Sequence, residues 1–275
     1  MSAERHFRMS ALNGVIALRQ YIDGNAGVTP EQAATSLIRI DADFASSDYR
    51  TALELHALVP IECSCADPVA GLRGMISFLA EYHRPLWTRQ MVLGRRRVFS
   101  QLNGDERQVF RSAGLFGDPP TGDIVDWWDG ICLKLRLLRE AELLAQGRRA
   151  ERLSLAFEAR RLQGLGIVDD PVWVSIDDNT AGYDIRSWNA GPEVPPARLI
   201  EVKSSSANPP VIVISRNEWE QANRYGTSFV FHFWDFKGQN ELLYEKSVEE
   251  VRPHIPVDAG SGRWRNAEIP LKLFR

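Results

Sequence analysis

The chain has 275 residues, a net charge of −3 and 25% charged side chains. These values are ordinary for a globular protein with one large or two modest domains, and the slight acidity argues against a general nucleic-acid coating protein, which is usually basic. The first residues are polar and mixed in charge, and no run approaches the roughly 18 apolar residues of a membrane helix. We therefore expect no signal peptide, no membrane span and a cytoplasmic location. The three cysteines, Cys63, Cys65 and Cys132, fit neither a disulfide framework nor a zinc site and are expected to be plain thiols.

The first half of the chain has the apolar spacing of helices. Thr29 has the features of an N-cap, because a proline follows it and a glutamine lies three residues later. A turn rich in glycine and proline is expected at residues 117–122. After it, residues 123–163 favour helix almost throughout, with a break expected near Gly147. Besides the helix that Thr29 begins, the helices expected before the turn span residues 11–22, 47–58, 69–82 and 103–114.

One basic cluster in this half has two alternative explanations. Arg95, Arg96 and Arg97 follow Arg89 and Trp87 closely. Arginines beside an aromatic side chain can contact a nucleic-acid backbone, and a cluster of this size is also common on a solvated face. No helix-turn-helix or zinc-finger pattern accompanies the cluster. The sequence therefore predicts a helical amino-terminal domain, residues 1–145, for targeting or partner binding.

Near Gly164 the pattern changes from helix to short strands rich in Val, Ile, Phe, Tyr and Trp. A helix is expected at residues 215–225, since Ser215 is suited to be the N-cap and Glu218 completes a capping box. The predicted fold class is α/β (α+β), with a mixed sheet flanked by helices in a second domain at residues 146–275. The expected strands span residues 172–176, 183–188, 198–204, 211–214, 228–234 and 241–245.

The strand at residues 198–204 carries an unusual pair of charges. Alternate side chains of a strand share a face, so Glu201 and Lys203 point to one side while Ile200 and Val202 point to the other. A cross-strand ion pair on the surface explains such a pair, at about 0–1 kcal/mol. A functional site is the alternative explanation. It is favoured if further carboxylates lie close to Glu201 and Lys203.

Two further carboxylates are candidates to join the pair. Asp184 is predicted to lie on the preceding strand, where pairing places it beside Glu201. Two close carboxylates raise one another's pKa unless a cation lies between them, and Mg²⁺ suits oxygen ligands. Glu158 lies on the apolar stripe of a helix, between Leu155 and Leu162, where it is costly unless it is paired or bound to a metal ion. A salt bridge to a neighbouring arginine is the alternative for Glu158.

These motifs resemble a known family. Gly182-Tyr-Asp-Ile, then Ile200-Glu-Val-Lys-Ser, then Ile214-Ser-Arg-Asn-Glu-Trp-Glu-Gln-Ala, are similar to the DUF3883-like branch of the PD-(D/E)XK nuclease superfamily over roughly residues 146–245. The family's proline is absent, because Tyr183 precedes Asp184. The resemblance implies a restriction-endonuclease-like core. It further implies a catalytic set and a set of Mg²⁺ ligands: Asp184, Glu201, Lys203 and Glu158 for catalysis, and Asp184, Glu201, Glu158 and the backbone carbonyl of Val202 for the metal ion.

The resulting hypothesis is a metal-dependent endonuclease that uses Mg²⁺, with Mn²⁺ as a substitute, to hydrolyse phosphodiester bonds. Lys203 would act either as an electrostatic stabiliser or as a base. DNA is expected as the partner more than RNA, in the setting of bacterial restriction or antiviral defence, with a defence-system partner protein or a homodimer as further expectations. The alternative is a catalytically silent or partner-activated nuclease-fold module that binds nucleic acid or protein.

Other polar residues near the motif are assigned weaker roles. Ser204, Ser205 and Ser206 either donate hydrogen bonds to a phosphate or end the strand and form a turn. Gln221 is an auxiliary candidate on the helix after the strand. His232 lies between phenylalanines and is expected to be a core or edge histidine, not a ligand.

Overall fold

The computed structural model describes residues 3–40, 42–60, 65–191 and 196–274. The chain divides into two compact units, Met1–Arg139 (unit 1) and Glu140–Arg275 (unit 2). The fold is α+β, with a helical amino-terminal region followed by a mixed five-stranded sheet flanked by helices, as the sequence predicts. Within the described ranges, no helix combines the length and the apolar composition that crossing a membrane requires. Cys63 lies outside the described residues, whereas Cys65 is a buried free thiol and Cys132 a half-buried one.

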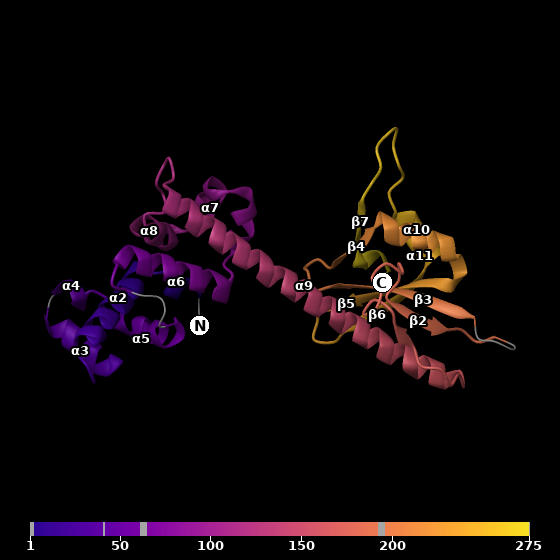
Figure 1. Cartoon of the computed structure of the whole chain (residues 1–275), viewed down its shortest axis with the longest axis horizontal. Helices are drawn as coiled ribbons and strands as arrows, with labels where there is room; N and C mark the ends of the chain where they lie inside the picture. The colour runs from indigo at the N-terminus through magenta and orange to yellow at the C-terminus, as the bar shows by residue number, and fades with distance from the viewer. Residues whose placement is uncertain (1–2, 41, 61–64, 192–195, 275) are drawn as a thin grey trace. The chain divides into compact units, whose positions relative to one another are not determined.

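Unit 1 is a bundle of helices around one apolar core (Figure 1). Asp48 and Asp67 cap two of its helices through hydrogen bonds to backbone N–H groups, and Asn103 forms a capping box with Glu106 in a third. The core includes the fully buried rings of Phe7, Trp87 and Phe110. The helices are α1 Ala3–His6, α2 Met9–Gly24, α3 Pro30–Ile40, α4 Ala42–Ala45, α5 Tyr49–Leu58, α6 Pro68–His83, the 3-10 helix η1 Leu86–Leu93, α7 Arg95–Gln101, α8 Gly104–Ser112 and the beginning of α9 Gly122–Gly164.

The helix α9 is continuous over 43 residues, so the expected break near Gly147 is wrong. A single glycine costs a helix only about 1 kcal/mol relative to alanine. The neighbouring residues Arg148, Arg149 and Glu151 compensate by forming ion pairs and hydrogen bonds with residues of the sheet region. Tertiary contacts on both sides of Gly147 therefore stabilise the helix at this position.

Unit 2 is built on a five-stranded sheet with the strand order β1-β2-β3-β5-β6. β3 and β5 are parallel, and the other neighbouring pairs are antiparallel. A separate two-stranded sheet joins β4 to β7. The strands are β1 Val172–Trp173, β2 Ile185–Trp188, β3 Ala197–Ser205, β4 Val211–Ser215, β5 Phe229–Asp235, β6 Leu242–Ser247 and β7 Asn266–Pro270, and the helices that follow them are α10 Arg216–Tyr225, η2 Gly226–Ser228, α11 Val248–Val251, η3 Arg252–His254 and η4 Leu271–Phe274.

The two faces of the five-stranded sheet pack against different elements. One face, here called the α9 face, meets the carboxyl-terminal part of α9, and its core includes Ile200, Val202 and Val230. The other face, here called the α10 face, lies under α10, α11 and the β4–β7 sheet, and its core includes Leu199 and Phe231. The alternation of side chains along β3 therefore divides them between two separate cores.

The helix α10 begins as the sequence predicts. Ser215 accepts a hydrogen bond from the N–H of Glu218, and the Glu218 carboxylate accepts one from the N–H of Ser215. Because α10 lies between β4 and β5 in the chain, this capping box fixes the start of the crossover that makes β3 and β5 parallel. The crossover places α10 over the same face of β3 that carries Glu201.

Candidate active site

Glu201 and Lys203 lie on the α10 face of β3, as their spacing predicts. Glu201 is only 4% exposed and is opposite Phe231 of the neighbouring strand β5. The Lys203 ammonium lies 2.6 Å from the Glu201 carboxylate. Because the glutamate is buried, the alternative of a surface ion pair is wrong for these two residues.

Asp184 is brought to the same place by the pairing of β2 with β3. The strand β2 begins at Ile185, one residue later than Asp184, and Ile185 is paired with Ile200. The backbone N–H of Asp184 donates to the carbonyl of Ile200 at 2.9 Å. Its carboxylate accepts a hydrogen bond from the N–H of Val202 at 2.8 Å. The side chain of Asp184 is thus fixed against the Glu201–Val202 peptide.

Gly182 makes this approach of the chain to α10 feasible. Its φ is +80°, a conformation that favours glycine, and a Cβ at this position would lie 2.5 Å from Cγ of Gln221 on α10. Gln221 therefore packs directly against the backbone that leads into Asp184. It is close to the candidate site, and its auxiliary role stays a prediction.

Lys203 is held between two carboxylates. Besides Glu201, its ammonium contacts Glu218 at 3.0 Å. Glu218 was expected only to cap α10, and it does both, because one oxygen accepts from the Ser215 N–H while the other contacts Lys203. The structure thereby adds Glu218 to the group that the sequence predicts.

The electrostatics of this group favour an additional cation. Burial raises the pKa of Glu201 to about 8, against the opposing effect of Lys203. Burial likewise raises the pKa of Asp184 to about 6, although its hydrogen bond from Val202 lowers it. Burial lowers the pKa of Lys203, but Glu201 and Glu218 outweigh it and hold that pKa above its usual value. Lys203 is therefore a cation, and it does not fully compensate the carboxylates around it.

A further carboxylate, Glu151 of α9, raises the pKa of Asp184 by its charge. It accepts hydrogen bonds from Ser175 at 2.7 Å and from the indole of Trp173, and it pairs with Arg148 at 2.7 Å. The backbone N–H of Ser175 in turn donates to the Asp184 carbonyl at 3.1 Å. Glu151 is thereby held in place next to the segment that carries Asp184.

Glu151 was not among the residues predicted from the sequence, because the helix offers two equivalent carboxylates. Glu151 and Glu158 are seven residues apart and thus lie on the same stripe of α9. Periodicity shows which stripe of a helix is buried, but it does not show which turn lies over which part of the sheet.

The structure does not bring Glu158 to Asp184 and Glu201. Glu158 is fully buried on the α9 face, whereas Glu201 is on the α10 face. Its carboxylate pairs with Arg161 at 2.7 Å and lies 3.4 Å from Arg198, so the alternative of a salt bridge to a neighbouring arginine is confirmed. The placement of Glu158 in the catalytic group is corrected accordingly, because the sheet separates the two.

Glu158 belongs to a second group of charges, here called the α9-face cluster, in which Glu158, Arg198 and His232 are buried, Arg161 is half-buried and Glu245 is exposed. His232 is fully buried, and its Nε2 lies 3.7 Å from Glu158 and 3.6 Å from Glu245, so the expectation of a core histidine is confirmed. Ligand atoms of Glu158, His232 and Glu245 all lie within 4.8 Å of one another, which is close enough for a metal ion. Two arginines already neutralise the two glutamates, however, so a divalent ion there would add uncompensated positive charge.

The first two serines after Lys203 end β3, and Ser206 follows the strand. Ser205 ends β3, and its hydroxyl accepts from the N–H of Val211 at the start of β4. Ser204 and Ser206 contact Gln146 of α9. The expectation that these serines end the strand is therefore confirmed, and hydrogen bonds from them to a phosphate stay a prediction. The carbonyl of Val202 as a metal ligand stays a prediction.

The donor set on the α10 face fits a hard divalent cation. Asp184 and Glu201 offer carboxylate oxygens with raised pKa values, and the charge of Glu151 on α9 also reaches Asp184. Oxygen ligands of this kind suit Mg²⁺, which binds with few protein carboxylates and retains waters. The buried carboxylate of Glu201, with half-buried Asp184 and Glu218 near the same single lysine, is costly without such an ion.

The family described as "Protein NO VEIN, C-terminal" matches residues 150–245 of the chain. This family is associated with nuclease-like and DUF3883 domains. The matched range includes all the residues of the candidate site and most of the five-stranded sheet. Searches of curated proteins and of solved structures give no match. The coarse statement that unit 2 is similar to a nuclease-like module therefore rests on this family alone.

Proposed function

We propose that unit 2 is a metal-dependent endonuclease that hydrolyses phosphodiester bonds at Asp184, Glu201 and Lys203. The observation that carries the proposal is the convergence of half-buried Asp184 and Lys203 on the buried carboxylate of Glu201. They come from the edge of β2 and from the middle of β3, and Glu201 is 4% exposed. A group of charges of this kind lowers the stability of the fold when no further cation compensates it. Groups with perturbed pKa values cluster at functional sites.

Each residue has a role that its position allows. Asp184 and Glu201 would hold the cation, and Glu151 would complete or orient the carboxylate group from α9. A bound divalent cation supplies charge neutralisation at the phosphate and a water of lowered pKa. Lys203, oriented by Glu218, would neutralise negative charge on the phosphate as it develops in the transition state. Because two carboxylates hold Lys203 as an ammonium, we assign it the role of stabiliser rather than of base.

DNA is the proposed substrate more than RNA, and bacterial restriction or antiviral defence is the proposed setting. Both follow from the DUF3883-like resemblance of the motifs around Asp184 and Glu201. A defence-system partner protein and self-association belong to the same proposal. The family match is consistent with a nuclease-like module and supports this proposal at that coarser level.

The proposal is tested by incubating the full chain with labelled single- and double-stranded DNA and RNA in Mg²⁺, Mn²⁺ or EDTA. We expect cleavage in either metal and none in EDTA. The substitutions Asp184→Asn and Lys203→Ala should each lower the rate by at least about 100-fold, the typical effect of removing one electrostatic contact to a transition state. Each variant is first compared with the wild type by circular dichroism.

A matched control is Lys246→Ala, which removes a lysine of β6 that pairs with Glu250 of α11. This variant should cut at the rate of the wild type. Cleavage that survives both site substitutions would show that the assigned residues are wrong. If the wild type binds nucleic acid and cuts nothing under any condition, the module is catalytically silent or needs a partner.

A further inference from the structure

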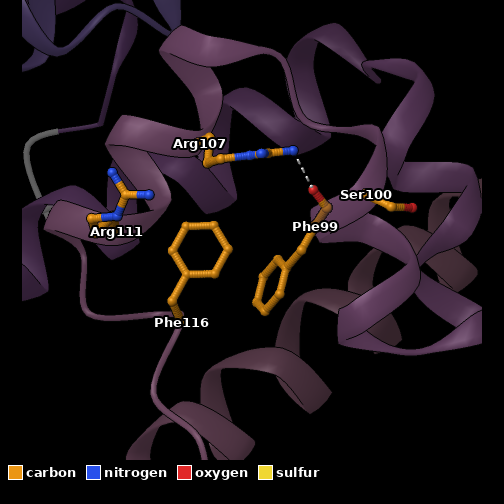
Figure 2. Close-up of a pocket in the computed structure, with 5 residues that line it drawn as sticks. All are labelled: Phe99, Ser100, Arg107, Arg111 and Phe116. Carbon is orange, nitrogen blue, oxygen red and sulfur yellow. Dashed lines mark hydrogen bonds between the residues drawn. The ribbon is translucent and has the colours of Figure 1, made fainter.

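Unit 1 contains a pocket that the proposed nuclease site does not use. It has a volume of about 410 Å³, within the ~300–1,000 Å³ range of small-molecule sites. Figure 2 shows the rings of Phe99 and Phe116 side by side in this pocket, with the side chains of Arg107 and Arg111 beside them. The pocket is lined by Phe99, Ser100, Arg107, Arg111 and Phe116, which come from α7, from α8 and from the segment after α8.

The two aromatic rings are available to a ligand. Phe99 and Phe116 are both half-buried, and their centroids lie 4.3 Å apart at an interplanar angle of 62°. Phe99 also packs edge-on against Phe110 of the core, which holds it in place. The rings thus form a rigid apolar wall that remains partly open to solvent. Because the rings meet at 62°, the wall is angled, and a planar base would stack on one ring while its edge meets the other.

The positive charge at the pocket is uncompensated. The guanidinium of Arg111 lies 5.8 Å from the centroid of Phe116, and among the described residues it has neither a carboxylate partner nor a hydrogen bond. Arg107 donates to the carbonyls of Phe99 at 3.1 Å and Leu102 at 3.4 Å and is likewise without an acidic partner in the described chain. These bonds leave donors of Arg107 free and fix its side chain along the pocket.

A third arginine extends this charge. Arg95 lies over the ring of Phe99 at 5.6 Å and donates to the carbonyl of Gly117. Its other terminal nitrogen is buried and has no hydrogen-bond partner within the described part of the chain. Arg95 does not line the pocket itself, and it adds positive charge behind the ring of Phe99.

The expected role of Trp87 in a basic patch is wrong. Trp87 is 2% exposed, and its indole N–H donates to the buried carboxylate of Glu106. The aromatic side chains that accompany the arginines are instead Phe99 and Phe116. Nucleic-acid contact by Arg95, Arg96 and Arg97 stays a prediction, but Trp87 cannot take part in it, because it is part of the core.

We propose that this pocket binds a nucleotide unit, with the base against Phe99 and Phe116 and the phosphate at Arg107 and Arg111. The chemistry supports it: aromatic rings take bases of any sequence, and guanidinium groups bind phosphate oxygens with fixed geometry. The same chemistry is offered by an unpaired nucleotide of a single strand and by a free mononucleotide. The inference goes beyond the proposed nuclease activity and does not depend on it, because the pocket belongs to unit 1 alone.

The test measures binding by the full chain in EDTA, where metal-dependent cleavage cannot interfere. Fluorescence anisotropy follows short labelled single-stranded DNA and RNA at several salt concentrations. The substitution Arg111→Gln should weaken binding about tenfold and lower the slope of log Kd against log salt by about 1. Phe116→Leu should weaken binding about tenfold, the effect of losing one stacked base. Since leucine retains most of the volume, this variant should fold normally, and circular dichroism checks it.

The matched control is Arg39→Gln, which removes one exposed arginine on α3, outside the pocket. Binding by this variant should equal that of the wild type. Competition by unlabelled AMP would identify a free nucleotide as sufficient, and competition by oligonucleotides alone would identify a unit within a strand. No binding by the wild type at low salt, or equal weakening by Arg39→Gln and Arg111→Gln, would overturn the proposal.

Discussion

Each face of the five-stranded sheet carries a group of charges around a buried glutamate, but only one of the two groups is balanced. In the α9-face cluster, two glutamates meet two arginines, with a histidine between them. In the candidate site on the α10 face, Asp184, Glu201 and Glu218 surround the single ammonium of Lys203. The same sheet therefore carries one group of charges that is complete and another that has an excess of negative charge.

We infer that this difference separates a structural role from the proposed functional one. Buried charges that are paired with each other can hold α9 on the sheet, and removing one of them leaves its partner uncompensated. Buried carboxylates in excess instead destabilise the fold until a cation or a proton neutralises them. Burial alone does not distinguish the two groups, because Glu158 and Glu201 are both buried. The sum of the charges within each group distinguishes them.

The largest expected effect is on stability, and it concerns the balanced group. The substitution Glu158→Gln preserves the shape of the side chain but leaves Arg161 and Arg198 without their shared carboxylate. We expect the free energy of unfolding of unit 2 to fall by about 3 kcal/mol, as for other broken buried ion pairs. Urea unfolding, followed by near-ultraviolet circular dichroism, measures the change.

The matched control for this prediction is Glu201→Gln on the other face. It removes a buried carboxylate whose pKa is raised to about 8, so without metal ions at pH 9 the variant should be at least as stable as the wild type. A similar loss of stability in both variants would mean that both groups of charges stabilise the fold. The distinction between the two faces would then be wrong.

The sequence predicted the site on the α10 face better than its surroundings. The alternation along residues 198–204 is sufficient to place Glu201 and Lys203 together, and strand pairing adds Asp184. Local signals also predicted the capping box at the start of α10. These features depend on residues that are close together in the chain, and the pattern of the sequence predicts such local relations.

The remainder depended on contacts between distant elements. The choice between Glu151 and Glu158 follows from how far α9 extends along the sheet, which no local pattern records. The strand β7 was not predicted, because its partner β4 lies more than fifty residues earlier in the chain. The pocket beside Phe99 likewise joins α7 to the segment after α8, and only the packing of unit 1 brings them together.

A smaller effect is expected from adding Mg²⁺, and it should depend on pH. The folded-state pKa values of Asp184 and Glu201 are raised to about 6 and about 8, so the metal-free fold loses stability as pH rises through this range. Mg²⁺ competes with those protons and should bind more tightly at pH 8.5 than at pH 5.5. At tenfold its Kd, the ion stabilises the fold by about 1.4 kcal/mol. Thermal unfolding at constant ionic strength, with and without Mg²⁺, measures this.

The control for the metal effect is a variant of each face. Asp184→Asn should abolish the stabilisation by Mg²⁺, and Glu245→Gln should not. The opposite result would place the cation at Glu158, His232 and Glu245 instead, where ligand atoms also lie close enough together. A stabilisation by Mg²⁺ of equal size at both pH values would contradict the raised pKa values of the site.

The smallest effect is expected at Glu218, where the site and the fold share one side chain. Glu218→Gln retains an oxygen for the N–H of Ser215, so the cap of α10 should remain, but it removes one of the two carboxylates beside Lys203. Because Glu218 is partly exposed, we expect a stability loss below about 1 kcal/mol and a cleavage rate within tenfold of the wild type. Ser215→Ala, which removes the hydroxyl of the cap, should cost about 1 kcal/mol without changing the charges. Urea unfolding and cleavage assays on both variants separate the two roles. If Glu218→Gln abolished cleavage as Lys203→Ala is expected to do, Glu218 would belong to the catalytic group itself.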